Sequence, residues 1–139
     1  STFEQVMRIN VTSQFMLTQA VMPLLEESKA GSIVFTTSSV GRKAKAYWGA
    51  YAISKFATEA MMQLLADELE NTSEIRVNAI NPGATSTNMR SRAFPAEDPT
   101  SIATPESIMP LYLYLMGNDS LKINGQSIDA QAKKDQAAL

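Results

Sequence analysis

Apolar positions recur along the chain with two different periods. From about residue 3 to residue 28 they return every three to four positions, which predicts a long helix with a broad apolar face. The same helical period runs through residues 50–70. A shorter, β-branched apolar run at 31–38 is instead typical of a buried strand, and residues 75–81, which run into a Pro-Gly turn, predict a second strand. A strand, a helix and a second strand in this order predict a βαβ unit of a parallel sheet with a right-handed crossover.

The remaining segments are more polar and carry local signals. Residues 40–49 predict a basic loop, and residues 82–103 predict a long connection with short helical turns. Thr104 followed by Pro105 is an N-cap with proline at the first helical position, so we expect a helix from there to about residue 116. A last short strand is expected at about 125–130.

Composition changes this picture mainly by exclusion. The 139 residues contain no histidine and no cysteine, which excludes a Ser-His-Asp triad, disulfides and zinc–thiolate sites within them, and we expect no metal. The lack of cysteine fits a reducing compartment, and we expect a cytoplasmic protein. A net charge of −2 gives no reason to expect nucleic acid. No apolar run approaches the roughly 20 residues of a membrane span, so no membrane partner is expected.

Tyr51 and Lys55 are the first candidates for chemistry. Residues four positions apart lie on the same face of a helix, with their Cβ atoms about 5–6 Å apart. A cation at that place favours the phenolate, so the tyrosine can donate or accept a proton near neutral pH, as carbonyl reduction or alcohol oxidation requires. The spacing also arises by chance, and the pair alone would favour two helix-surface residues without a role.

The context of the pair favours a site. Ser38 is the last residue of the first predicted strand, and the turn at Pro82–Thr87 directly follows the second predicted strand. In parallel sheets the ligand crevice lies beyond the carboxyl ends of the strands. Ser38 and this turn both fall at that end, and the helix that carries Tyr51 starts near it.

These motifs together resemble the short-chain dehydrogenase/reductase family, in its ordinary single-domain type. Ser38 lies thirteen residues before Tyr51 and seven after Gly31, as the family's catalytic serine does. Asn10 fits the helix asparagine that completes the family's Asn-Ser-Tyr-Lys tetrad. The segment 81–89, Asn-Pro-Gly-Ala-Thr-Ser-Thr-Asn-Met, is similar to the family's turn that contacts the nicotinamide carboxamide. The motifs occur in the family's order, which makes the resemblance specific.

The resemblance implies a fold and an activity. The fold is α/β, the carboxyl-terminal half of a Rossmann-type doubly wound parallel sheet over residues 1–131, followed by a polar tail at 132–139. The activity is an NAD(P)-dependent interconversion of a small-molecule carbonyl and an alcohol, with NAD or NADP as cofactor. The implied catalytic residues are Asn10, Ser38, Tyr51 and Lys55. The implied cofactor-binding residues are Tyr51, Lys55, Pro82, Gly83, Thr85 and Thr87.

The resemblance also assigns a role to each member of the tetrad. Tyr51 is the general acid/base, and Ser38 donates a hydrogen bond to the substrate oxygen. Lys55 supports Tyr51 and holds the nicotinamide ribose, while Asn10 holds a water that links Lys55 to solvent. Within the family, Trp48-Gly-Ala-Tyr51 followed by Ser-Lys-Phe-Ala-Thr-Glu is most similar to bacterial oxidoreductases of unassigned substrate.

The glycine-rich turn that cradles the cofactor pyrophosphate in this family has no counterpart here. None of the family's glycine patterns can be built from the six glycines present. We therefore expect the sequence to correspond to the carboxyl-terminal half of a dehydrogenase. A second hypothesis is a catalytically silent assembly module of the same fold. In related enzymes the helices that correspond to about 3–28 and 50–70 pack against their copies, which implies a homodimer or homotetramer.

Two further segments leave alternatives open. The cations Arg42, Lys43 and Lys45 could form a nucleotide clamp, but such runs are more often solvated loops, and we favour the loop. The long connection at 82–103 follows the turn directly. Long irregular connections often form binding loops, so a substrate lid is favoured over a passive linker.

Overall fold

The sheet of this protein is parallel and has three strands. The computed structural model describes residues 1–132. The strands lie in the order β1 (Ser32–Thr36), β2 (Arg76–Asn81) and β3 (Ser127–Asp129). Both neighbouring pairs are parallel. The predicted α/β fold class is confirmed, whereas the predicted polar tail lies outside the described residues apart from Ala132.

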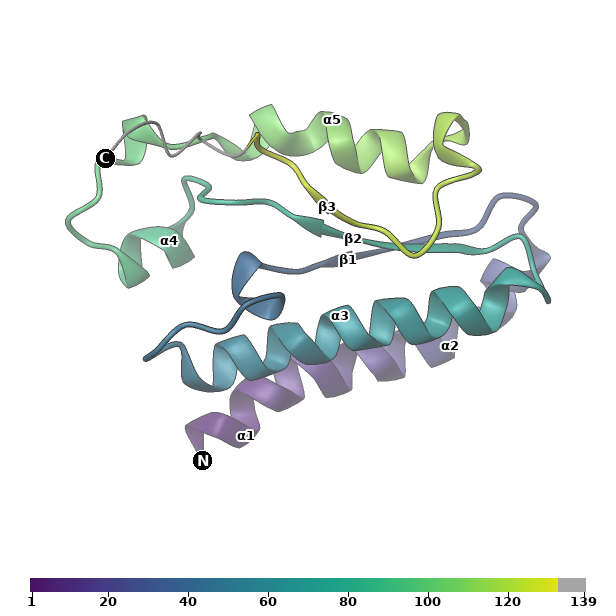
Figure 1. Cartoon of the computed structure of the whole chain (residues 1–139), viewed down its shortest axis with the longest axis horizontal. Coiled ribbons are helices and arrows are strands. Elements are labelled where there is room, and N and C mark those ends of the chain that lie inside the picture. Colours follow the sequence, from purple (N-terminus) through teal and green to yellow (C-terminus); the bar gives the residue numbers. More distant parts are fainter. Residues whose placement is uncertain (133–139) are drawn as a thin grey trace.

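Helices cover both faces of the sheet (Figure 1). The long helix α3 (Gly49–Glu70) lies along one face together with α2 (Ser13–Glu27), and α5 (Pro105–Met116) lies along the other. The short helix α4 (Asn88–Ala93) stands apart, beyond the end of β2. The connections at the carboxyl ends of β1 and β2 therefore meet on the side of the molecule where α3 begins.

The core lies between α3 and the sheet. Met62 and Ala66 from α3 pack there with buried residues of the strands, among them Phe35, Val77 and Ala79. The first five residues of β2 are all buried. Burial on both faces is typical of a central strand in a parallel sheet. The two polar members, Arg76 and Asn78, donate to backbone carbonyl oxygens of the neighbouring segments.

Two predicted elements differ from the structure in their limits. The helix predicted at 3–28 consists of α1 (Thr2–Met7), a π-helical segment (Arg8–Thr12) and α2. The strand predicted at 31–38 ends at Thr36, because the chain turns away into a 3-10 helix over Ser39–Gly41.

The connection after β2 and the helix that follows it agree with the prediction. Residues 82–103 contain α4 and a 3-10 turn at Pro99–Ser101. Thr104 caps α5, and its side chain accepts a hydrogen bond from the Ser107 N–H at 3.3 Å. Within residues 1–132, no helix has both the length and the apolar character to cross a membrane.

Candidate active site

Ser38 lies where the chain leaves β1 and turns toward α3. Its side chain caps the following 3-10 turn by accepting a hydrogen bond from the Val40 N–H at 3.4 Å. Gly41 ends this turn directly against α3. A Cβ atom at Gly41 would lie 2.7 Å from the carbonyl oxygen of Lys55, which is too close for any side chain. The glycine therefore lets the Ser38 turn pack onto the helix that carries Tyr51.

Tyr51 and Lys55 lie on successive turns of α3. Lys55 Nζ is 5.5 Å from the centre of the Tyr51 ring and donates a hydrogen bond to the carbonyl oxygen of Thr36 at 2.9 Å. Only 8% of Lys55 is exposed, and this burial lowers the pKa of its ammonium group from the ordinary value of 10.5. The Tyr51 hydroxyl has no hydrogen-bond partner within residues 1–132. The pair thus combines a buried cation with a free phenol.

Asn10 lies in the π-helical segment between α1 and α2. Such segments shift the helical register and are frequent at functional sites. Asn10 Nδ2 donates to Ser54 Oγ at 3.0 Å, and Ser54 Oγ donates to the Tyr51 carbonyl oxygen at 2.7 Å. The amide of Asn10 therefore contacts the first turns of α3 near Tyr51. Within residues 1–132 no direct hydrogen bond joins it to Lys55, the residue to which the resemblance linked it through a water.

The turn after β2 is held from two sides. Gly83 has a φ of 73°, a conformation that favours glycine, and its N–H donates to Asn81 Oδ1 at 3.1 Å. Gln131, which follows β3, donates through Nε2 to the carbonyl oxygens of Pro82 at 2.7 Å and Ala84 at 2.9 Å. The turn is therefore fixed to the end of β2 and to the segment after β3.

Thr85 and Thr87 lead from this turn into α4. Thr85 is buried, and its hydroxyl donates to the Gly83 carbonyl oxygen at 3.1 Å. Thr87 caps α4, because its side chain accepts from the Arg90 N–H at 3.2 Å. Both threonines thus shape the backbone of the turn and also border the space in front of it.

A cavity of about 630 Å³ lies at this end of the sheet. It brings together predicted site residues from three parts of the chain, because its lining includes Ser38, Tyr51, Pro82, Gly83, Thr85 and Thr87. Asn10 and Lys55 do not line the cavity. Asn10 contacts Ser54 of α3, the helix that carries Tyr51. Lys55, also in α3, contacts the Thr36 carbonyl, two residues before Ser38.

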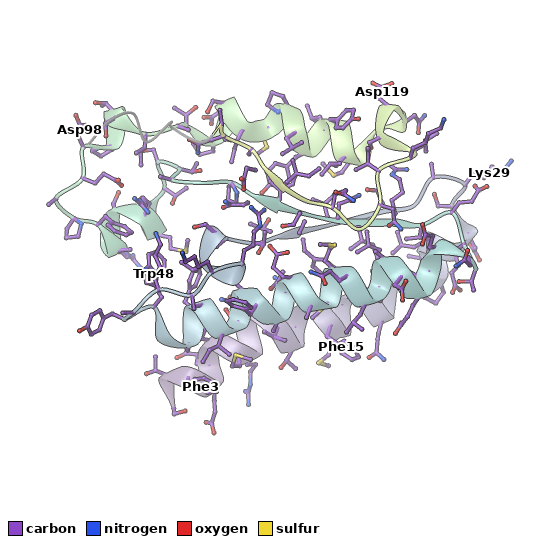
Figure 2. The ribbon with its side chains drawn as sticks, in the orientation of Figure 1. Phe3, Phe15, Lys29, Trp48, Asp98 and Asp119 are labelled. Carbon is purple, nitrogen blue, oxygen red and sulfur yellow. The ribbon has the colours of Figure 1, made fainter. Side chains whose placement is uncertain are left out.

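The segment predicted as a lid supplies one wall of the cavity. The rings of Trp48 and Phe94 are 6.2 Å apart, and Figure 2 shows Trp48 between the start of α3 and α4. The Arg90 guanidinium lies 3.7 Å from the centre of the Phe94 ring. It also forms two hydrogen bonds with the Glu97 carboxylate, at 2.6 and 2.8 Å. Sequence reasoning did not single out this aromatic wall.

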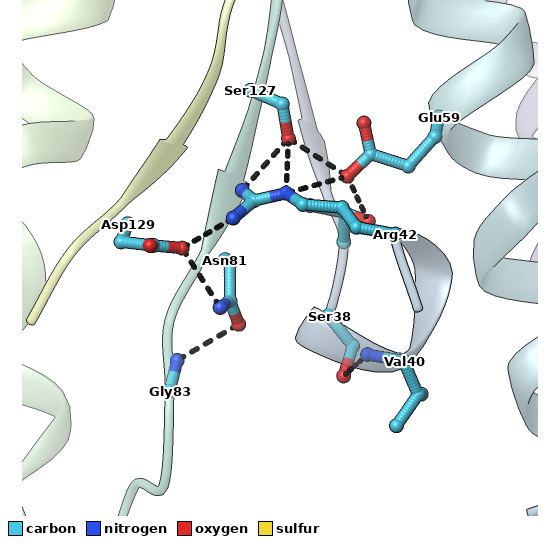
Figure 3. Close-up of polar contacts among 9 residues, drawn as sticks. Ser38, Val40, Arg42, Glu59, Asn81, Gly83, Ser127 and Asp129 are labelled. Atoms are coloured by element: carbon cyan, nitrogen blue, oxygen red, sulfur yellow. Dashed lines mark hydrogen bonds and ion pairs between the residues drawn. The ribbon is translucent and has the colours of Figure 1, made fainter. Parts of the chain in front are cut away.

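A polar network that the sequence did not predict lies beside these parts (Figure 3). Glu59, which is 6% exposed, accepts hydrogen bonds from Thr37 Oγ1 at 2.9 Å and Ser127 Oγ at 2.7 Å. Arg42 Nε approaches the same carboxylate oxygen at 3.3 Å, and Arg42 Nη1 donates to Asp129 Oδ1 at 2.6 Å. The network therefore joins α3 to the end of β1 and to β3.

Arg42 lies in an exposed loop, as the favoured interpretation has it, but it also takes part in this network. It is exposed and does not line the cavity, but its guanidinium is bonded to Glu59, Ser127 and Asp129. Lys43 is exposed, as the loop interpretation requires. One signal in the sequence pointed to the network: Glu59 follows Lys55 by four positions and so lies on the same face of α3.

No three histidine, cysteine or carboxylate side chains are grouped in a way that could hold a metal ion within residues 1–132. The cavity lining itself offers hydroxyl groups and the phenols of Tyr47 and Tyr51, and the Lys55 ammonium lies beside the Tyr51 ring.

Comparison with known proteins assigns the chain to a family. The family model of the short chain dehydrogenases matches residues 1–98. The uncharacterized oxidoreductase YciK of Escherichia coli (strain K12) is 60% identical over 129 residues, which cover 93% of this chain and 50% of YciK. An NADPH-dependent aldehyde reductase-like protein of Arabidopsis thaliana is 31% identical over 135 residues, covering 91% of this chain and 50% of that protein.

Solved structures give the same result. A short chain dehydrogenase from Salmonella enterica serovar Typhi superimposes with a TM-score of 0.91 at 62% identity, covering 94% of this chain and 53% of that one. One from Shigella flexneri, complexed with NADP, gives a TM-score of 0.90 at 61% identity, covering 94% and 54%. The chain belongs to the short-chain dehydrogenase/reductase family, and it spans about half the length of the relatives it matches.

Proposed function

We propose that the complete protein carrying these residues is an NAD(P)-dependent oxidoreductase that interconverts a carbonyl and an alcohol. One observation carries the proposal: the Tyr51 hydroxyl borders a cavity, is unpartnered within residues 1–132, and has a buried ammonium beside its ring. Ser38 and the turn after β2 border the same cavity. A proton donor, a hydroxyl that can bind an oxygen and a place for a cofactor thus meet in one space.

The residues around this cavity fit a nicotinamide cofactor. The turn at Pro82–Thr87 offers backbone groups and hydroxyls, which are suitable partners for a carboxamide. Lys55 lies behind the cavity lining. It uses one of its three N–H groups on the Thr36 carbonyl, which leaves the others for the ribose hydroxyls that the resemblance assigns to it. The Shigella relative was solved with NADP and an Escherichia coli CFT073 relative, 60% identical, with NADPH. NADPH is therefore the first cofactor to test.

When bound, the cofactor supplies or accepts the hydride. In reduction, Tyr51 donates its proton to the carbonyl oxygen, and in oxidation it takes the proton from the alcohol. The Ser38 hydroxyl donates a hydrogen bond to that oxygen and stabilises the negative charge that develops there. The Lys55 ammonium stabilises the phenolate that remains after Tyr51 has given up its proton. Asn10 acts through Ser54, which holds the turn of α3 that carries Tyr51.

One wall of the cavity suits an uncharged, apolar substituent on the substrate. Trp48, Met89 and Phe94 line it. Arg90 is the one ionised side chain on the cavity within residues 1–132, and its charge is already paired with Glu97. An apolar aldehyde or ketone would bury its substituent against these rings, whereas a carboxylate would find no unpaired cation among these residues.

The test replaces Tyr51 by phenylalanine in the complete protein. We expect Tyr51→Phe to lower turnover of NADPH with carbonyl substrates by about 10²- to 10⁴-fold, because the proton donor is lost. The dissociation constant for NADPH, measured by fluorescence titration, should stay within about twofold of the parent value. Tyr47→Phe is the matched control, since Tyr47 borders the same cavity but is fully exposed. Turnover of Tyr51→Phe within a few-fold of the parent would overturn the assignment.

A second candidate function is the silent assembly module, and one surface favours self-association. A groove of about 550 Å³ runs between α2 and α3, and its lining includes Phe15, Met22, Met61, Leu64 and Leu65. Phe15 and Leu64 are exposed. Large exposed apolar patches mark association sites, which supports a homodimer or homotetramer through these helices. Carbonyl turnover separates the two candidates, because both predict the same assembly.

We also propose a cytoplasmic location, on the lack of cysteine alone.

A further inference from the structure

The network in Figure 3 connects the two parts of the proposed active site. One part consists of α3 and the end of β1, which carry Tyr51 and Ser38. The other part is the turn after β2, centred on Gly83. The two parts lie far apart in the sequence, so the distance between them has to be set by tertiary contacts.

The first part is held together by two bonds between α3 and the end of β1. Lys55 donates to the Thr36 carbonyl oxygen at 2.9 Å, and Glu59, one turn further along α3, accepts from the Thr37 hydroxyl at 2.9 Å. Ser38 follows directly. These bonds fix the serine relative to the helix that carries the tyrosine.

The second part is held by a chain of bonds from β3. Asp129 Oδ1 accepts from Asn81 Nδ2 at 2.9 Å, and Asn81 Oδ1 accepts from the Gly83 N–H at 3.1 Å. The orientation of the Asn81 amide is therefore set by Asp129. A change at Asp129 would be transmitted to the backbone of the turn.

Arg42 bridges the two parts. Its Nε lies 3.3 Å from Glu59 Oε1 and 3.0 Å from Ser127 Oγ, and its Nη1 lies 2.6 Å from Asp129 Oδ1. A planar guanidinium can serve such divergent acceptors at once, and a lysine ammonium cannot reproduce that geometry. Without Arg42, the carboxylates of Glu59 and Asp129 would have no positive charge between them.

We propose that Arg42 is a positioning residue that sets the place of the Gly83 turn relative to Ser38 and Tyr51. Arg42 does not line the cavity, so it acts through Glu59 and Asp129. Its catalytic consequence rests on the proposed function. Its structural consequence, the fixing of the turn, does not.

The structural consequence is tested without cofactor or substrate. Hydrogen–deuterium exchange is measured by mass spectrometry on peptides that span 81–87, in the complete protein and in Arg42→Gln. We expect exchange in this segment to become about tenfold faster, because Asp129 loses the guanidinium that fixes it and therefore holds Asn81 less firmly. The matched control is Lys43→Gln, which removes a neighbouring, exposed cation of the same loop and should leave exchange unchanged.

The catalytic consequence is tested by kinetics on the same variants. We expect Arg42→Gln to lower kcat by about 10- to 100-fold, as a displacement of about 1 Å does at an active site. Its NADPH dissociation constant should rise several-fold. Arg42→Lys keeps the positive charge but lacks the planar guanidinium. Its kcat and its NADPH dissociation constant should lie between those of the parent and of Arg42→Gln. The double variant Arg42→Gln/Asp129→Asn should have the same kcat as Arg42→Gln, because both substitutions remove the same Arg42–Asp129 bond.

The outcomes separate the two proposals. Faster exchange at 81–87 in a protein that reduces no carbonyl would refute the oxidoreductase assignment and leave the positioning role standing. Equal exchange in Arg42→Gln, Lys43→Gln and the parent would overturn the positioning role, whatever the turnover. If Arg42→Gln does not fold, the comparison rests on Arg42→Lys, for which unchanged exchange and unchanged kcat would refute the proposal.

Discussion

The floor and the lid of the cavity are held in different ways. The floor is formed by the end of β1, the first turns of α3 and the turn at 82–87, and the lid by residues 88–103. Beneath the floor lie two buried groups: Lys55, bonded to the last carbonyl of β1, and Glu59, bonded to the side chain of Thr37 directly after β1. The lid is tied by the partly exposed Arg90–Glu97 ion pair, by ring contacts and by a single bridge between Thr85 and Ala103.

This difference separates two tasks. Proton transfer needs groups whose positions are fixed to within a fraction of an ångström, and buried, mutually bonded side chains provide that. Substrate selection tolerates a wall that adjusts, and loops on a rigid scaffold commonly supply it. The chemistry of the site should therefore depend on the floor, and the range of substrates on the lid.

The strongest test of the comparison removes one carboxylate from each region. Glu59→Ala leaves the buried hydroxyl of Thr37 without its acceptor and removes one of the three acceptors of Arg42, so we expect the free energy of unfolding to fall by about 3 kcal/mol. Glu97→Ala breaks a partly exposed ion pair and should lower it by at most about 1 kcal/mol. Urea unfolding of both variants at one protein concentration gives the two values. Equal losses would show that the lid is as firmly built as the floor.

The fold of both regions follows largely from patterns in the sequence. β2 was recognisable because its residues run into a Pro-Gly turn, and α5 because Thr104 and Pro105 mark a helix start. Ser38, Tyr51 and the turn after β2 were recognisable because strand ends and helical spacing bring them to one end of the sheet. Each of these inferences needs only local sequence and a general rule of topology.

The network under the floor could not be predicted in the same way. Its members run from Thr37 to Asp129, and each is an ordinary polar residue whose partner is far along the chain. Arg42 is one of three cations in its loop, and nothing local separates it from Lys43. The π-helical segment around Asn10 was missed for a related reason, since a change of hydrogen-bond register leaves the apolar period almost unchanged.

A smaller effect should follow from changing the lid alone. Phe94→Ala removes the ring that contacts Trp48 and Arg90, and we expect KM for an apolar carbonyl substrate to rise about tenfold. The value of kcat and the NADPH dissociation constant should stay within about twofold. Phe94→Leu is the control that keeps apolar volume and removes the aromatic face. A fall in kcat at unchanged KM would mean that the lid takes part in the chemistry, and the division of tasks would be wrong.

The smallest expected effect concerns the two cations, Lys55 under the floor and Arg90 in the lid. Burial lowers the pKa of Lys55 from 10.5, whereas the hydrogen bond from Arg90 to Glu97 raises the pKa of Arg90. Between the lowered pKa of Lys55 and 10.5, the unfolded chain binds more protons at this residue than the folded chain. The contribution of Lys55 to folding stability must therefore increase as pH rises through this window, and below the window the penalty for its burial is at its full size.

The Lys55 effect can be isolated by removing the neighbouring phenol first. Unfolding free energies of Tyr51→Phe and Tyr51→Phe/Lys55→Met are compared in urea from neutral pH up to pH 10.5, the ordinary pKa of lysine. The first variant should gain stability relative to the second as pH rises, while loss of the Thr36 bond adds only a pH-independent offset. Arg90→Met in the same background should show no such slope, because Arg90 stays charged throughout. If the difference in unfolding free energy between the two variants instead falls as pH rises, neighbours such as Glu59 stabilise the Lys55 charge more than burial opposes it. The Lys55 ammonium would then contribute a net electrostatic attraction to the floor.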